Sequence, residues 1–109
     1  MTGEAESYNE LEKQVAHFSR AIGHPARVAI LMAIVKNGNL IEGEVVNVPQ
    51  LSGTTVIQHL RELKRAGIIQ GRIFGAKSKY SVDILEVRRL SEFMELFLVE
   101  TLKPGKTLS

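Results

Sequence analysis

The stretch Leu51-Ser52-Gly53-Thr54-Thr55-Val56-Ile57-Gln58-His59-Leu60 decides the fold of this chain. Ser52 is a typical helix N-cap and Ala66-Gly67 is a typical helix end, so the sequence predicts a helix from about residue 52 to residue 66. At about 100° per residue, three apolar residues cluster on one side of this helix: Val56, Leu60 and Leu63. We expect this side to be buried.

The opposite face of the predicted helix is cationic and polar, and it holds Thr54, Gln58, Arg61 and Arg65. Amide and guanidinium groups hydrogen bond to base edges in the major groove of DNA, and Arg also binds phosphate. An ordinary solvent-exposed face would explain the same residues. That alternative is weaker here because Glu62, the only acidic residue of the helix, lies to one side.

A basic hairpin is predicted directly after this helix. Residues 68–74 and 79–82 have the composition of two strands, and Gly75-Ala76-Lys77-Ser78 forms the turn between them. Residues 52–82 contain six Lys or Arg against one Glu, a formal charge of +5 in a chain whose total is +2. A local basic patch is typical of a phosphate-binding surface, although a solvated basic face accounts for the charge equally well.

Two helices are predicted before the helix of residues 52–66. The first runs from Tyr8 to Ile22 and is ended by Gly23; the second runs from Pro25 to Lys36. Its segment 28–35 is apolar nearly all round, so we expect it at the centre of the core. Between residues 39 and 51, Leu40-Ile41 favours a short strand and residues 42–47 favour a brief helix.

Helix, turn, helix and basic hairpin follow one another in the order of a winged helix-turn-helix. The sequence therefore predicts a single domain over residues 1–109, mainly α with a small β-hairpin and about five helices, with residues 1–6 and 103–109 as flexible tails. The last helix, residues 85–102, has apolar side chains in too many directions for one core. We expect a second subunit to cover the apolar side chains that the core leaves over, among them Leu90, Phe93, Met94, Phe97 and Leu98.

Composition excludes several classes of site. The chain has no Cys, which excludes disulfides, thiolate metal sites and cysteine nucleophiles. We expect His17 on the surface, His24 as a cap or packing residue and His59 as a hydrogen-bonded structural residue, so neither a metal site nor a cofactor is predicted. The longest apolar run is too short to span a membrane, and the acidic N-terminus is unlike a signal peptide. A cytoplasmic protein without a membrane partner is the default expectation.

Three segments of the chain, in order, resemble the ArsR/SmtB family of small dimeric winged-helix repressors: residues 21–31 (AIGHPARVAIL), 51–60 (LSGTTVIQHL) and 63–69 (LKRAGII). The similarity extends over about residues 15–100. It implies a homodimer that is joined by the first and last helices, with Leu11, Val15 and Phe18 of the first helix in the interface. Such a dimer presents one recognition helix to each half of a DNA operator. It also implies base contacts at Gly53, Thr54, Ile57 and Gln58 and phosphate contacts by Arg72, Lys77 and Lys79. Ile57 stands where the family usually has Ser, which favours methyl contacts over hydrogen bonds.

The full predicted DNA-binding set adds Ser52, Thr55, Arg61 and Arg65 to these positions. Many family members sense metals through a Cys-x-Cys pair, whose positions here are Ile41 and Gly43. We therefore expect a repressor that does not sense metal through the usual sites. A winged-helix module for protein–protein contact is the alternative, and the sequence lacks the residue sets of an enzyme. The sequence does not identify the effector: it is a small organic ligand or a partner protein, or the protein has no ligand.

Overall fold

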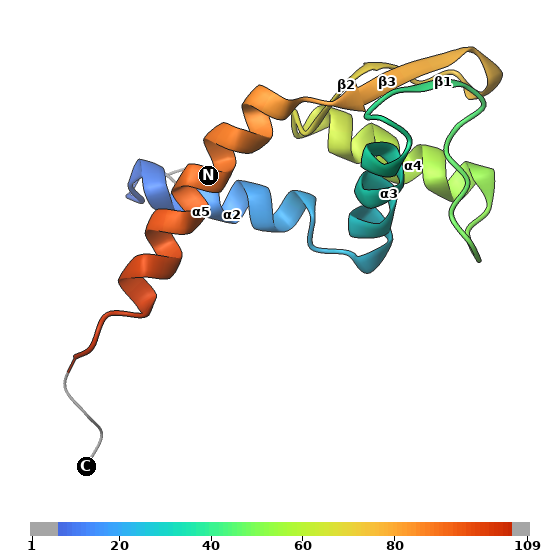
Figure 1. Cartoon of the computed structure of the whole chain (residues 1–109). Coiled ribbons are helices and arrows are strands. Elements are labelled where there is room, and N and C mark those ends of the chain that lie inside the picture. Colours follow the sequence, from blue (N-terminus) through green and yellow to red (C-terminus); the bar gives the residue numbers. More distant parts are fainter. Residues whose placement is uncertain (1–6, 106–109) are drawn as a thin grey trace.

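The computed structural model describes residues 7–105 (Figure 1), and its order of elements confirms a mainly helical winged helix-turn-helix. The described helices and strands are α2 (Glu10–Ala21), α3 (Pro25–Lys36), β1 (Ile41–Gly43), α4 (Gly53–Arg65), β2 (Ile69–Arg72), the 3-10 helix η1 (Gly75–Lys77), β3 (Ser78–Val82) and α5 (Ile84–Thr101). Residues 103–105 have no regular structure. The other residues of the predicted tails, 1–6 and 106–109, lie outside the described range.

The predicted brief helix over residues 42–47 is wrong, so the described range has four α-helices rather than about five. Strand β1 occupies the start of that segment, and Gly43 has a φ of 99°, which a helix does not allow. The backbone N–H of Val46 donates to the Tyr80 hydroxyl at 2.9 Å instead of to a helical carbonyl. A long-range hydrogen bond thus overrides the local preference.

The helix ends follow their capping residues closely. Helix α2 begins at Glu10 rather than Tyr8, because Asn9 and Glu12 form a reciprocal capping box. Its C-cap is Ile22 rather than the predicted Gly23. Gly23 is needed for a different reason: a Cβ there would lie 2.7 Å from the Ser19 carbonyl oxygen. The chain can therefore turn tightly from α2 into α3.

The three strands form one antiparallel sheet in the order β1-β3-β2, at the upper right of Figure 1. Tyr80 in the central strand pairs with Ile41 on one side and Gly71 on the other. Gly71 has a φ of 116°, and a Cβ there would lie 2.2 Å from the Lys79 carbonyl oxygen. The close pairing of β2 with β3 therefore requires glycine at this position.

The core lies between α3, α4, the sheet and the first half of α5. Its fully buried side chains include Ile30 and Ile34 of α3 and Leu90 of α5. The prediction that α3 is surrounded by core is wrong, because Val28, Met32 and Val35 are each about half exposed. Only one side of α3 packs on α4 and β3. The domain is too small to cover the other side.

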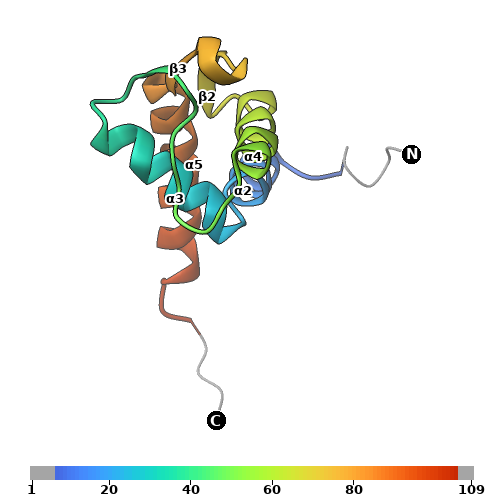
Figure 2. The ribbon, with the colours of Figure 1, turned by 90° about the vertical axis from the view of Figure 1, so that its right-hand side faces the viewer.

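Helix α2 packs along α5, and the guanidinium of Arg89 donates to the Gln14 side-chain oxygen between them. The C-terminal half of α5 extends beyond all the other helices and strands in Figures 1 and 2. Every residue from Glu95 to Thr101 is exposed. Within residues 7–105 no single helix is long and apolar enough to cross a membrane; α2 and α3 reach that composition only as a pair bent by 84°.

Candidate nucleic-acid interface

Helix α4 has the two faces that its sequence predicts. Val56, Leu60 and Leu63 are at most 1% exposed, whereas the opposite side, here called the polar face, is exposed and consists of Thr54, Gln58, Arg61 and Arg65. The side chains of Thr54, Gln58 and Arg61 form no hydrogen bond or ion pair with any residue in the range 7–105. Their donors and acceptors are therefore available to a ligand.

The N-terminus of α4 combines capping with exposure. The Ser52 hydroxyl accepts from the Thr55 backbone N–H at 3.2 Å and lies 3.0 Å from the Thr55 hydroxyl. Both hydroxyls therefore already have a partner. Gly53 is exposed, and a Cβ added there would meet nothing within 4 Å. Ile57 is half-buried and packs against the core, so only part of its side chain is accessible from outside.

The hairpin formed by β2, η1 and β3, here called the wing, presents exposed Arg72, Lys77 and Lys79. The Arg72 Nε donates to the Lys77 carbonyl at 3.2 Å. Lys79 Nζ lies 3.9 Å from the Glu42 carboxylate, and both side chains are more than half exposed, so this pair is weak. Three cations therefore remain available on the surface of the wing.

The structure also connects the histidines to the helix-turn-helix. The Nδ1 atom of His24 accepts from the Ala26 N–H at 3.0 Å, and the Nδ1 of His59 accepts from Arg27 Nε at 3.1 Å. Both predictions, a cap and a hydrogen-bonded structural residue, are confirmed. Burial lowers the pKa of His59 below its usual value of 6.5, and the nearby His24 ring and Arg27 lower it further.

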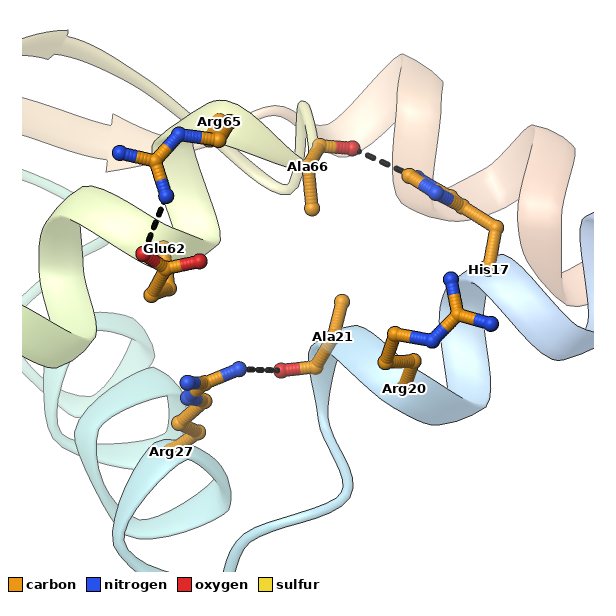
Figure 3. Close-up of a pocket in the computed structure, with 7 residues that line it drawn as sticks. All are labelled: His17, Arg20, Ala21, Arg27, Glu62, Arg65 and Ala66. Atoms are coloured by element: carbon orange, nitrogen blue, oxygen red, sulfur yellow. Dashed lines mark hydrogen bonds and ion pairs between the residues drawn. The ribbon is translucent and has the colours of Figure 1, made fainter. Parts of the chain in front are cut away.

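The prediction for His17 is wrong. It is half-buried rather than a plain surface residue, and its Nε2 donates to the Ala66 carbonyl at the end of α4, at 2.8 Å. With six other residues it lines a pocket of about 200 Å³ between α2, α3 and α4 (Figure 3): Arg20, Ala21, Arg27, Glu62, Arg65 and Ala66. Sequence patterns do not reveal this pocket, because its walls come from segments about 40 residues apart.

The residues predicted to join two subunits fall into three groups. Leu11, Val15, Phe18, Phe93 and Met94 are half-buried, and Phe97 and Leu98 are exposed. Leu90 is fully buried inside the chain, so we remove it from the predicted surface. Among residues 7–105, no group of three or more His, Asp or Glu side chains is placed to hold a metal ion.

The fold and the exposed residues of α4 and the wing define a winged helix-turn-helix protein. The chain is 29% identical to the uncharacterised HTH-type transcriptional regulator MJ1325 of Methanocaldococcus jannaschii, over 79% of this chain and 97% of that protein. It is 35% identical to a Staphylococcus aureus protein named cadmium resistance transcriptional regulatory protein CadC homolog, over 72% of this chain and 64% of that protein. This chain thus spans slightly less than two thirds of the second relative.

No family model matches the chain. Both relatives are named as transcriptional regulators rather than as enzymes. The similarity, together with the fold, supports a DNA-binding transcriptional regulator.

Proposed function

We propose that this chain is a homodimeric, sequence-specific repressor of the ArsR/SmtB type that binds an operator with two half-sites. One observation carries the proposal: the polar face of α4 is exposed and opposite a buried stripe, and its Thr54, Gln58 and Arg61 side chains have no partner in the described chain. A helix with this arrangement fits the major groove of DNA.

Base recognition and phosphate binding are assigned to different elements. Gln58 and Arg61 in the middle of the polar face suit adenine and guanine. A Gln amide donates to adenine N7 and accepts from its N6 amino group, and a guanidinium donates to guanine O6 and N7. Thr54 and the accessible part of Ile57 suit a thymine methyl group, and Gly53 lets the backbone approach closely. Arg72, Lys77 and Lys79 on the wing suit phosphates, which position the protein without specifying sequence. Ser52 and Thr55 act by holding the helix end, while Arg65 extends the cationic surface.

Dimerisation is supported by the exposed end of α5. Leu96, Phe97, Leu98 and Val99 are consecutive, point in four directions around the helix and are all 39% exposed or more. A second copy of the chain, packed against α2 and α5, would cover them. Two recognition helices related by a two-fold axis would then meet half-sites about one helical turn apart, about 10 bp.

The proposed repressor does not depend on metal. The chain has no Cys, and the described residues hold no cluster of suitable ligands. The Staphylococcus relative, in contrast, is named for cadmium resistance. The cytoplasm is the compartment that this function implies.

The test begins with enrichment of bound duplexes from a random DNA pool, followed by anisotropy titrations on the enriched and on scrambled duplexes. Gln58→Ala should weaken binding to the enriched duplex by about 1–3 kcal/mol per subunit, about double in a dimer, and weaken binding to scrambled DNA much less. Lys79→Ala should weaken both alike and lower the salt slope by about one unit for each phosphate that the variant no longer binds. Lys103→Ala, just after the end of α5, is the matched control.

If Gln58→Ala weakens both complexes equally, α4 does not recognise sequence. A winged-helix module that binds an acidic protein is the second candidate, because the same cationic surface would suit it. In that case no duplex would be enriched, and binding to random DNA would be weak at physiological salt.

A further inference from the structure

The pocket between α2, α3 and α4 has a strong excess of positive charge. Its lining contains three guanidinium groups, Arg20, Arg27 and Arg65, against the single carboxylate of Glu62. With His17 neutral, three positive charges and one negative charge give a formal charge of +2. Figure 3 shows these side chains arranged around one open space.

The charges of the pocket are only partly neutralised by the protein itself. Arg65 forms an ion pair with Glu62, and Arg27 donates to the Ala21 carbonyl at 3.1 Å. Within residues 7–105, the Arg20 guanidinium has neither a hydrogen bond nor an ion pair. At least one cationic group therefore faces the pocket without a partner in the described chain.

Two helix ends also face the pocket, and their carbonyl groups would repel an anion. Both carbonyls are already occupied: that of Ala21 accepts from Arg27, and that of Ala66 accepts from His17 Nε2. The dipoles of α2 and α4 are therefore countered locally, and the guanidinium groups determine the sign of the site.

We propose that this pocket binds a small anion carrying a phosphate or carboxylate group, taken from free solution. Guanidinium groups match both groups by charge-assisted, bidentate hydrogen bonds. Pockets for drug-sized ligands are typically about 300–1,000 Å³, so a volume of about 200 Å³ suits a small anion or the anionic end of a larger molecule. Arg20 is its primary ligand, Arg27 supplies a fixed second charge, and Glu62 competes with the anion for Arg65.

Anion binding in this pocket is coupled to DNA binding through Arg65, an inference that rests on the proposed function. Arg65 belongs both to the pocket and to the polar face of α4. An anion that draws Arg65 into the pocket removes one cation from the DNA-facing surface and adds negative charge beside the end of α4. The bound anion therefore lowers the affinity for DNA.

Binding is measured without DNA, by following backbone amide shifts of the full chain in NMR during titration with inorganic phosphate. Chloride is exchanged for phosphate at constant ionic strength, because screening alone would shift charged residues. We expect saturable shifts at Arg20, Ala66 and Gly67. Arg20→Gln should weaken phosphate binding at least about tenfold, since hydrogen bonds to charged groups contribute about 1.5–3 kcal/mol.

Glu62→Gln separates a binding role from a structural one, because it should tighten phosphate binding severalfold by releasing Arg65. A site that is merely structural would be weakened by both substitutions. Arg88→Gln, an exposed Arg of α5 outside the pocket, is the matched control and should leave phosphate binding unchanged. Shifts that do not saturate, or that survive Arg20→Gln, would overturn the proposal.

The source of the anion is tested on random duplex DNA. For a free anion, Arg20→Gln leaves the salt slope unchanged, and phosphate at constant ionic strength weakens DNA binding by the wild type more than by Arg20→Gln. A salt slope lowered by about one unit per subunit would instead assign the pocket to a DNA phosphate and overturn the free-anion proposal. Saturable phosphate binding by a chain that binds no DNA would leave the site standing while the proposed function fails.

Discussion

Tyr80→Phe tests how the winged domain holds the segment that leads into α4. The Tyr80 ring is 1% exposed, and its hydroxyl accepts from the Val46 N–H at 2.9 Å. Phe fills the same space but leaves this half-buried N–H without its partner, which costs about 1–3 kcal/mol. At an unfolding entropy of about 2.1 cal/mol/K per residue, the melting temperature should fall by roughly 4–13 °C.

The assay is thermal unfolding by circular dichroism at one fixed protein concentration, because association would also shift the midpoint. Tyr8→Phe makes the same change at an exposed ring and should leave the melting temperature within error. Burial raises the pKa of the Tyr80 phenol above its usual value of 10.0. The stability contributed by the buried, neutral phenol is therefore present below pH 10 and is lost as pH rises through the folded pKa. Equal melting temperatures for both variants would refute the role of this hydrogen bond.

Three further outcomes follow from the described contacts. Because the folded chain lowers the pKa of His59, this residue contributes stability above about pH 6.5, and the contribution is lost as pH falls through the folded pKa. His59→Gln should therefore flatten the pH dependence of the unfolding free energy just below pH 6.5. Phe97→Glu should convert a dimer into monomer in sedimentation at micromolar concentration; a monomeric wild type would contradict the dimer. Stoichiometric cadmium or zinc should leave DNA affinity unchanged in anisotropy titrations, whereas metal-coupled DNA release would reveal a missed site.

The helices α3 and α4 of the helix-turn-helix could be predicted closely because their limits depend on local chemistry. Ser52 caps α4 through the Thr55 N–H, and Pro25 begins α3 where its missing N–H costs nothing. The apolar spacing of Val56, Leu60 and Leu63 was enough to place the buried and exposed sides of α4. These features require only neighbours within one or two helical turns.

Long-range contacts account for what the sequence did not predict. The segment after β1 is held by the hydrogen bond from the Val46 N–H to the hydroxyl of Tyr80, 34 positions further along the chain. His17 reaches the carbonyl of Ala66 across 49 positions, and the cationic pocket depends on that same approach of α2 to α4. The apolar periodicity of α2 does not indicate that His17 will contact the C-terminal end of α4. The exposure of Met32 likewise depends on how many elements are available to cover α3.

The central claim is that the polar face of α4 recognises DNA sequence, and one measurement tests it most directly. It is the ratio of affinities for the enriched and scrambled duplexes, compared between the wild type and Gln58→Ala at one salt concentration. We expect this ratio to fall by at least about tenfold in the variant, since removing the hydrogen bonds to one base costs about 1–3 kcal/mol in each subunit. An unchanged ratio, with both duplexes bound as the wild type binds them, would contradict the claim.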